Sequence, residues 1–254
     1  MAAIFDSLKG KRVLITGSSR GLGRALALGF AENGADVAIH GVSCGSAMLE
    51  TVELASAFGG KVITVLGDLS DPNVPEKMIN EVIEKLGGID VLICNASIQI
   101  RRPWLDISDE DMHTQINTNF ISCIKLIQKS VPNMLSNGWG RVITIGSVQQ
   151  DKPHPDMLVY SAIKSGILNV VQSLAIQLAD KNITVNNVPV GTIYTDRNVD
   201  ALKDDEYHKK VKNDIPMKRI GNPEDCVDAV LMLASEGGRY ITGENLHIDG
   251  GKFI

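Results

Sequence analysis

Apolar residues along the chain follow two alternating spacings. Short apolar runs typical of buried strands are followed by longer segments in which apolar residues recur at helical intervals. The predicted strands are Arg12–Thr16, Asp36–His40, Lys61–Leu66, Ile89–Cys94, Arg141–Ile145, Ile183–Val188 and Asn245–Ile248. The predicted helices are Leu22–Glu32, Ala47–Phe58, Glu76–Leu86, Asp111–Leu135, Leu158–Ala179 and Pro223–Ser235. This alternation predicts βαβ units.

Successive βαβ units build a parallel sheet with helices on both faces. We therefore expect an α/β fold, a single doubly wound (Rossmann-type) domain over residues 1–254 with about seven strands. No low-complexity linker marks a second domain. Thr192–Met217 is polar and weakly periodic. Connections of this length often act as lids, so residues 192–217 are expected to cover the substrate.

Composition excludes several classes of function. Hydrophobic residues make up 44% and charged residues 22%, as in an ordinary globular protein. A net charge of −5 argues against nucleic acid or an acidic membrane as the main partner and favours a small molecule. Cys44, Cys94, Cys123 and Cys226 form no C-x-x-C pair, and the histidines show no metal-ligand spacing, so no metal is predicted. Without a targeting pattern or a run of about 18 apolar residues, the protein is expected to be cytoplasmic and not membrane-bound.

A glycine-rich turn joins the first predicted strand to the first helix. It reads Thr16-Gly17-Ser18-Ser19-Arg20-Gly21-Leu22-Gly23. Glycines allow a tight turn and let backbone N–H groups and the helix N-terminus approach an anionic pyrophosphate. Placed between strand and helix, the turn predicts a dinucleotide site.

The G-x-x-x-G-x-G spacing resembles that of the short-chain dehydrogenase/reductase family. Further motifs in family order extend the resemblance over the whole chain: Asp68-Leu69, Cys94-Asn95-Ala96-Ser97, Asn119, Ser147, Tyr160-Ser161-Ala162-Ile163-Lys164, Arg219–Asp225, Ile241-Thr242-Gly243 and Asp249-Gly250-Gly251. The resemblance implies a nicotinamide-dependent oxidoreductase with the catalytic residues Asn119, Ser147, Tyr160 and Lys164. A protein that keeps the fold as a cofactor-binding sensor without turnover is the alternative of another class, which the intact tetrad disfavours.

The residue types suit that chemistry. Tyr160 and Lys164 lie one helical turn apart, and an ammonium beside a phenol favours the phenolate, so Tyr160 can act as a general acid or base. The Ser147 hydroxyl can hold the substrate oxygen while charge develops on it. The resemblance implies that Lys164 also bonds the nicotinamide ribose and that Asn119 anchors a water linking Lys164 to solvent.

The end of the second strand bears on the choice of cofactor. NAD enzymes usually place a carboxylate there, and Gly41 takes that position. With no carboxylate to repel a 2′-phosphate and Arg20 able to reach one, NADP is preferred over NAD. His40 and Ser43 could serve either ribose. The other cofactor residues implied by the resemblance are Gly17, Ser19, Gly21, Leu22, Gly23, Asp68, Leu69, Asn95, Ala96, Tyr160, Lys164, Val190, Gly191, Ile193 and Thr195. Val190 stands where the family usually has proline.

Residues 95–104 and 147–150 resemble the gluconate 5-dehydrogenase and 2-deoxy-D-gluconate 3-dehydrogenase branch. An arginine matching Arg101 lies near the substrate there, and a guanidinium could clamp a sugar-acid carboxylate. The expected substrate residues are Arg101, Ser147, Gln149 and Tyr160. A 3-oxoacyl-[acyl-carrier-protein] reductase is the alternative, although Leu135–Trp139, where an acidic carrier would dock, is uncharged.

The resemblance also implies a homotetramer. One interface is expected from the helices Asp111–Leu135 and Leu158–Ala179, and another from Pro223–Ile254. This expectation also rests on apolar positions that exceed what one sheet face needs: Ile121, Ile124, Leu126, Ile167, Val170, Val171 and Leu174.

Overall fold

One parallel sheet organises the protein. The computed structural model describes residues 5–195, 198–199 and 203–254. Six strands lie in the order β3-β2-β1-β4-β5-β6. They are β1 (Arg12–Ile15), β2 (Asp36–Gly41), β3 (Val62–Leu66), β4 (Val91–Cys94), β5 (Gly140–Ser147) and β6 (Ile183–Val190), and every neighbouring pair is parallel. The chain order reverses between β1 and β4, which confirms the doubly wound fold.

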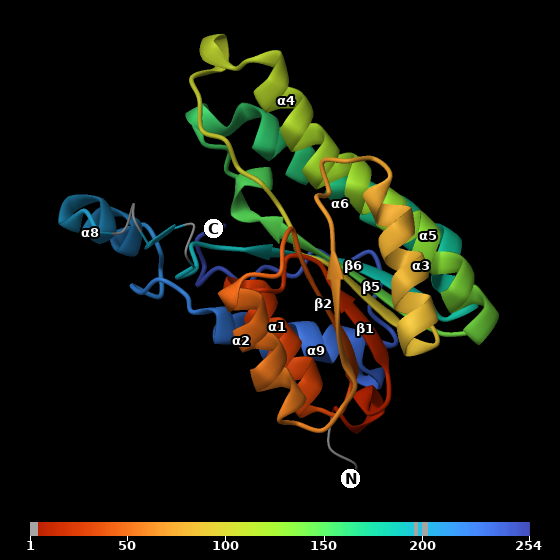
Figure 1. The fold of residues 1–254 in the computed structure, drawn as a ribbon. Coiled ribbons are helices and arrows are strands. Elements are labelled where there is room, and N and C mark those ends of the chain that lie inside the picture. The colour runs from red at the N-terminus through yellow and green to blue at the C-terminus, as the bar shows by residue number, and fades with distance from the viewer. Residues whose placement is uncertain (1–4, 196–197, 200–202) are drawn as a thin grey trace.

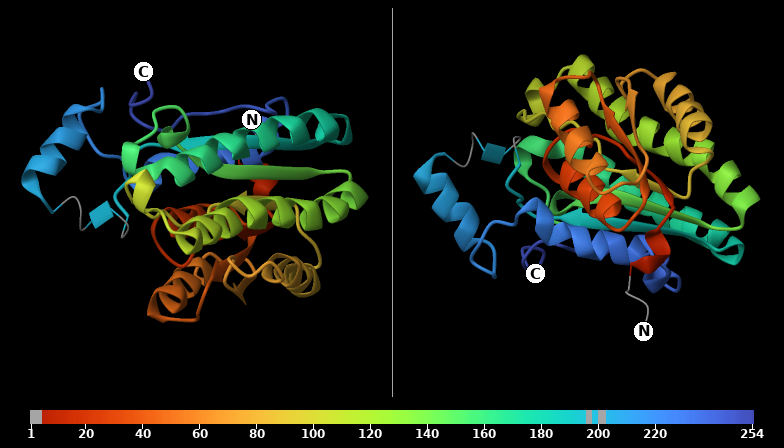
Figure 2. Two further views of the ribbon diagram at one scale, coloured as in Figure 1. Left: turned by 90° about the horizontal axis from the view of Figure 1, so that it is seen from above. Right: turned by 60° about the horizontal axis from the view of Figure 1, so that its bottom comes forward.

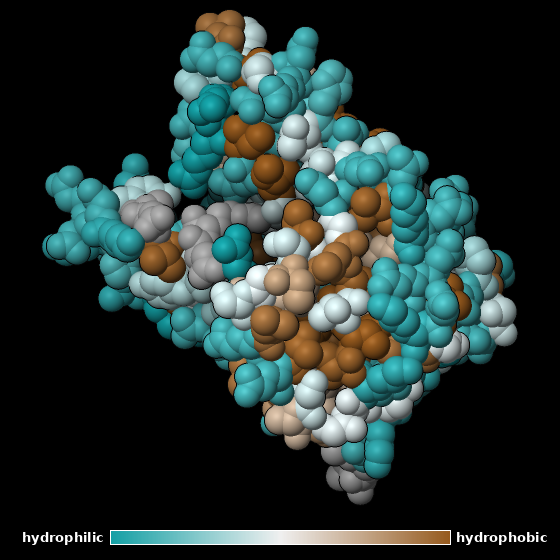
Figure 3. Space-filling model, in the orientation of Figure 1, coloured by the Kyte–Doolittle hydropathy of each residue, from teal (hydrophilic) through white to brown (hydrophobic). Residues whose placement is uncertain are grey.

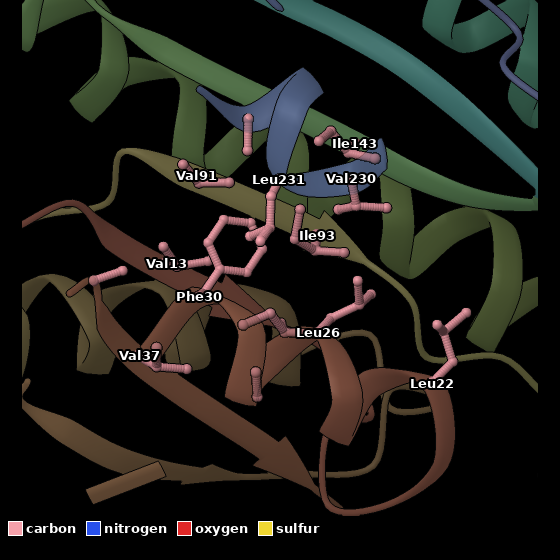
Figure 4. Close-up of a cluster of buried hydrophobic side chains, with 14 of the residues drawn as sticks. Val13, Leu22, Leu26, Phe30, Val37, Val91, Ile93, Ile143, Val230 and Leu231 are labelled. Atoms are coloured by element: carbon pink, nitrogen blue, oxygen red, sulfur yellow. The ribbon is translucent and has the colours of Figure 1, made fainter. Parts of the chain in front are cut away.

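Helices cover both faces of this sheet (Figure 1). The helices α1 (Gly21–Glu32), α2 (Ser46–Ser56) and α9 (Val227–Ala234) lie on one side, and α3 (Val74–Leu86), α5 (Ser122–Asn137) and α6 (Leu158–Leu178) lie on the other. Each side has its own apolar core. In the first, Phe30 and Leu26 of α1 and Leu231 of α9 lie in one cluster with Val13 and Ile93 of the sheet (Figure 4). Packing on both faces holds the strands in place, and with them the strand ends that carry the candidate site.

The expected seventh strand does not belong to the sheet. Residues 245–248 run parallel to the outer strand β6 and make only isolated bridges, Asn187 with Asn245 and Val190 with Ile248. Leu246 N and Ile248 N still donate to Asn187 O and Pro189 O, each at 2.9 Å. The segment therefore closes the β6 edge without forming a regular strand, and the sheet has one strand fewer than expected.

The predicted helix Asp111–Leu135 consists of three consecutive parts. α4 (Asp109–Ile116) leads into a π-helical turn, η3 (Asn117–Ile121), and then into α5. The Ser108 hydroxyl caps α4 by accepting from Asp111 N at 3.0 Å. A π turn inserts an extra residue into the helix and is often found at functional sites. Here it contains Asn119.

The apolar positions on which the expected interfaces rest differ in burial. Leu126, Ile167 and Val171 are buried in the core of the single chain, so they give no evidence for an interface. Ile121, Ile124, Val170 and Leu174 are half-buried, while Ile176 on α6 is 83% exposed.

The segment predicted as a lid contains a helix. α8 (Asp205–Asn213) projects from the body of the domain (Figure 1 and Figure 2), and Tyr194 Oη lies 2.9 Å from His208 Nε2. Residues 196–197 and 200–202 of the predicted lid lie outside the described residues. On the face shown in Figure 3, the surface is largely polar, with apolar side chains gathered near the edge strand β3.

Candidate active site

Most of the predicted site residues lie at the carboxyl edge of the sheet. The glycine-rich turn follows β1, and the other residues lie at or just after the ends of their strands: His40, Asp68, Leu69, Asn95, Ala96, Ser147, Val190 and Gly191. Ligands of open parallel sheets bind at this edge, next to the point where strand order reverses. Folding thus brings into one region groups that are far apart in the sequence.

The glycine-rich turn forms a cradle that other residues would fill. Gly17 and Gly21 have φ angles of 64° and 57°, in the left-handed region that favours glycine. A Cβ on Gly23 would collide with Gly17 O and would lie 2.6 Å from Asn95 Nδ2. The turn leads directly into the N-terminus of α1, where free N–H groups attract an anion. This arrangement fits the pyrophosphate of a dinucleotide, and the cradle also includes Ser19, Arg20 and Leu22.

Two residues from neighbouring strands hold the cradle in shape. Asn95 Nδ2 donates to Thr16 O at 2.8 Å and to Gly17 O at 3.1 Å. The Thr16 hydroxyl accepts from Asn95 N and Ala96 N, both at 3.0 Å. Asn95 and Ala96 therefore position the turn, and Thr16, whose role the sequence did not reveal, ties it to the end of β4.

His40 differs from its expected role. Its ring is buried, and both ring nitrogens bind the protein: Nδ1 accepts from Gly17 N at 2.9 Å, and Nε2 lies 3.0 Å from Gly67 O. This pairing requires a neutral ring with the proton on Nε2. Burial lowers the pKa of His40, which agrees with the neutral form. His40 therefore supports the glycine turn from behind, and its side chain has no free nitrogen for a ribose.

The end of β2 carries no carboxylate. Gly41 is followed by Val42 and Ser43, whose side chains are exposed. A Cβ on Gly41 would lie 3.5 Å from Ser19 Oγ, so this strand end adjoins the glycine turn. Arg20 is exposed in the same turn, and the exposed Asp68 follows β3. The geometry leaves room for a 2′-phosphate and places no acidic side chain at the position that would repel it.

Tyr160 and Lys164 both lie buried on α6. Lys164 Nζ is 5.6 Å from the centre of the Tyr160 ring. It donates to Ile145 O at 2.7 Å, at the end of the strand that carries Ser147. This hydrogen bond fixes the ammonium between the phenol-bearing helix and β5.

The π turn presents Asn119 toward the loop after β4. Asn119 Nδ2 donates to Ile98 O at 2.7 Å, and its Oδ1 accepts from Ile98 N at 2.8 Å. These two hydrogen bonds hold the 95–100 loop against the helix.

Ser147 ends β5, and its hydroxyl accepts from Gln149 N at 3.2 Å. Next to it lies a set of hydrogen-bonded side-chain amides, centred on the buried Asn187, that the sequence did not reveal. Asn187 Nδ2 donates to Gln150 Oε1 at 3.1 Å and to Asn245 Oδ1 at 2.7 Å, and a Cβ on Gly146 would collide with this pair. Such a satisfied polar network is rigid, so it fixes the loop that carries Ser147. The residues of this network are far apart in the sequence, so no local sequence pattern predicts that they form hydrogen bonds with one another.

A small cavity, with room for about one water molecule, lies beneath the catalytic cluster. Asn119 and Lys164 contribute to its wall, together with Thr16, Ala96, Cys94 and Cys123. It thus adjoins both the catalytic helix and the support of the glycine turn.

The segment after β6 reaches the glycine turn. Val190 still pairs with Ser147 in the sheet, and Gly191 packs on Asp249, whose Cα would lie 2.8 Å from a Cβ there. Thr195 lies beside Gly21, with its Cγ2 3.3 Å from the position of an added Cβ. Ile193 is buried and lines a second cavity of about 180 Å³. Residues 190–195 therefore lie between the end of β5 and the glycine turn after β1, where a nicotinamide could bind.

Arg101 and Arg102 have different surroundings. Arg102 Nε lies 3.4 Å from Asp111 Oδ2, and its backbone N donates to Asp156 O at 3.0 Å, which ties the loop to the turn before α6. Arg101 is exposed, and its guanidinium has no ion pair or hydrogen bond within the described part of the chain. It remains available for an acidic ligand.

The described residues contain no group of three or more His, Cys, Asp or Glu side chains arranged to hold a metal ion. Residues 155–181, which include α6, are long and apolar enough to cross a membrane, but 44% of the most apolar window is buried in the protein. Because α6 packs on β5 and β6 and carries Tyr160, its apolar character belongs to the core of the domain.

Known proteins match this chain over nearly its whole length. The family model described as enoyl-(acyl carrier protein) reductase matches residues 17–252. A glucose 1-dehydrogenase of Gluconobacter oxydans is 39% identical over 247 residues, 97% of this chain and 93% of that protein.

Two solved structures share the whole fold. A 3-oxoacyl-(acyl-carrier-protein) reductase of Agrobacterium tumefaciens C58 with NADP bound has a TM-score of 0.94 and 34% identity, over 99% of this chain and 97% of that one. A protein of Beutenbergia cavernae described as an NAD(P)-dependent gluconate 5-dehydrogenase, also with NADP, has a TM-score of 0.92 and 29% identity, over 97% and 98%.

Proposed function

Because this chain belongs to the short-chain dehydrogenase/reductase family, whose members are oxidoreductases acting on CH–OH groups, we propose that it transfers a hydride between NADP and a sugar acid such as gluconate or its keto form. The observation that carries the proposal is the placement of Lys164 Nζ between the Tyr160 ring and the end of β5, beside the glycine cradle. A structural helix has no need of a buried, positioned ammonium, since burying a charge is costly.

The residues divide the proton chemistry among them. Tyr160 takes a proton from the substrate hydroxyl, or returns one to the carbonyl oxygen. The Lys164 ammonium stabilises the phenolate that this leaves, and the Ser147 hydroxyl holds the substrate oxygen. When bound, the nicotinamide cofactor supplies or accepts the hydride. We assign Asn119 a positioning role, through the hydrogen bonds of its side chain to the backbone of Ile98.

NADP is the proposed cofactor, with NAD as the alternative. The glycine turn would hold the pyrophosphate, and Arg20 and Ser43 would lie toward the adenosine end. The absence of a carboxylate from the three residues Gly41–Ser43 supports NADP. Both solved structures compared above hold NADP, which also supports it.

A sugar-acid substrate is supported by the surroundings of the catalytic cluster. Arg101 has a guanidinium free to pair with a carboxylate, and Gln149 Oε1 is buried without a hydrogen-bond donor. A hydroxylated ligand could supply that donor. The similar glucose and gluconate dehydrogenases act on substrates of this polyhydroxylated kind.

A substrate panel tests the proposal. Aldonates, ketoaldonates, aldoses, polyols and acetoacetyl thioesters would be assayed with NADP and NAD in parallel, by the absorbance of the reduced cofactor. We expect the highest kcat/KM for an aldonate or ketoaldonate with NADP. Turnover of none of the sugar-derived compounds would refute the substrate proposal.

Arg101→Ala then tests recognition of the carboxylate. Charge-assisted hydrogen bonds contribute roughly 1.5–3 kcal/mol each, so kcat/KM for the acid should fall by about one to two powers of ten. It should barely change for the uncharged polyol. Arg102→Ala is the matched control, because Arg102 already pairs with Asp111. Equal losses on acid and polyol would mean that Arg101 only supports the loop.

The second candidate is a 3-oxoacyl-[acyl-carrier-protein] reductase, favoured by the TM-score of 0.94 to such an enzyme. Residues 135–139 carry no basic side chain for an acidic carrier. Faster turnover of the acetoacetyl thioester than of any sugar acid would establish this alternative. For either function we propose a cytoplasmic homotetramer, in which the exposed faces of α5 and α6 and the 223–254 region form the interfaces.

A further inference from the structure

Both ends of the segment predicted as a lid contact the last residues of the chain, 249–254, which we call the tail. At the start of the segment, the Thr192 hydroxyl accepts from Lys252 Nζ at 2.9 Å. At its end, Met217 N donates to Gly250 O at 3.1 Å. The tail therefore joins the two ends of a segment that is predicted to cover the substrate.

The tail is itself held in a defined shape. The Asp249 carboxylate accepts from Gly251 N at 2.8 Å and from Phe253 N at 2.6 Å. A Cβ on Gly250 would lie 2.8 Å from Ile215 Cγ2, so only glycine lets the tail approach the end of the segment this closely. A tail fixed by its own hydrogen bonds and by close packing can serve as a base for the segment above it.

The same tail is joined to the loop after β5, the strand that ends in the catalytic serine. Lys152 Nζ in this loop donates to Lys252 O at 3.1 Å and to Ile254 O at 2.8 Å. His247 Nε2, just before the tail, lies 3.0 Å from Asp151 Oδ2. The tail therefore contacts both the loop after β5 and the two ends of the predicted lid.

We propose that Lys252 is a positioning residue, which holds the base of the predicted lid in a fixed place relative to the loop after β5 and so shapes the substrate site. This inference rests on the proposed function, because it takes residues 192–217 as the cover of the substrate. The segment has a small core of its own, formed by Val211, Ile215 and Ile220. This core is separate from the two cores of the sheet, so contacts at the base, such as those with the tail, set the position of the segment.

A half-buried ammonium suits this role. Lys252 is partly covered by the protein, and this burial lowers its pKa, while Asp214 and Asp249 nearby favour the charged form. Taking a charge partly out of water costs free energy, and the hydrogen bond to Thr192 offsets part of that cost. Hydrogen bonds from an ionised donor are stronger than those between neutral groups, so this one can fix the start of the segment. A lysine that served only solubility would keep its ammonium in water.

Hydrogen exchange tests the base of the segment without a substrate. Tyr194 N donates to Gly221 O at 2.8 Å, and Met217 N donates to Gly250 O, so both amides report on this region. In Lys252→Met, peptides containing these amides should exchange roughly 10- to 100-fold faster than in the wild type, because a charge-assisted hydrogen bond is lost. Peptides of α1 should exchange at the wild-type rate. No change at the base, or a similar acceleration in α1, would overturn the proposal.

Kinetics on a substrate found in the panel then separate positioning from loss of stability. Lys252→Met and Thr192→Val should each raise KM by about tenfold, while the affinity of Lys252→Met for NADP, measured by fluorescence, should stay at the wild-type value. The double variant should be no worse than either single variant, because all three lack the same hydrogen bond. Thr192→Ser keeps the hydroxyl and should retain the wild-type KM.

Lys181→Met is the matched control. Lys181 Nζ also donates to the protein, to Gln177 O at 3.1 Å, but it lies beyond the end of α6 that is remote from Tyr160. This variant should match the wild type in both experiments. Additive losses in the double variant, a wild-type KM in both single variants, or an equal loss of NADP affinity would each overturn the proposal. If the panel yields no substrate, the proposed function fails, and the exchange experiment alone decides whether Lys252 holds the base.

Discussion

His40→Leu tests whether the buried histidine supports the glycine turn. Leucine has a similar volume but offers no nitrogen to Gly17 N or Gly67 O, which now lie 2.9 Å and 3.0 Å from the imidazole. An unsatisfied buried backbone group costs roughly 1–3 kcal/mol. Because both glycines are only half-buried, we take the lower part of that range, about 2–4 kcal/mol for the two together. Cofactor affinity should fall as well, since Gly17 forms the cradle.

Urea unfolding measures the stability, and titration of cofactor fluorescence measures the affinity. His113→Leu is the matched control, because His113 is exposed on α4. His40→Asn places an amide oxygen at the level of Nδ1, so it should restore the bond to Gly17, and with it most of the cofactor affinity, but not the bond to Gly67. If His40→Leu is as stable as His113→Leu and binds cofactor normally, the supporting role is wrong.

The pH dependence of stability provides a second test of the role of His40. Burial lowers the pKa of His40 below its ordinary value of 6.5. Just below pH 6.5, the His40 ring is therefore protonated in the unfolded chain but stays neutral in the folded protein. The stabilising contribution is therefore complete above pH 6.5 and is lost as the pH falls from there toward the folded pKa. The free energy of unfolding should decline more steeply on acidification in the wild type than in His40→Leu, and the gap between the two should narrow. A constant gap would mean that the ring is not held neutral.

Three further outcomes follow from the site and the surface. Tyr160→Phe should lower kcat by about 10²–10⁴-fold while cofactor binding persists, and retention of more than about a tenth of the rate would contradict the assigned proton transfer. Gly23→Ala should weaken cofactor binding in a fluorescence titration, because its Cβ would meet Gly17 O, whereas Gly45→Ala, with no atom within 4 Å of the added carbon, should bind normally. Light scattering at micromolar concentration should give the mass of a tetramer, and a monomer would exclude the proposed assembly.

Local sequence determined much of the fold. Strands buried on both faces read as unbroken apolar runs, and the helices between them keep their apolar spacing, so the alternation gives a parallel sheet without knowledge of the contacts. The last segment shows the limit of this inference. Asn245–Ile248 has the composition of a strand, but whether it joins the sheet depends on its fit against β6, where it forms only isolated bridges.

The candidate site divides in the same way. Tyr160 and Lys164 are four residues apart on one helix, and the glycine turn is continuous, so the sequence alone was enough to find them. The roles of His40 and Asn119 depend on partners far along the chain. A side chain's chemistry is set by whichever groups surround it after folding. Composition could therefore name His40 as a polar residue near the cofactor, but only the packed structure shows that both of its nitrogens are already bound.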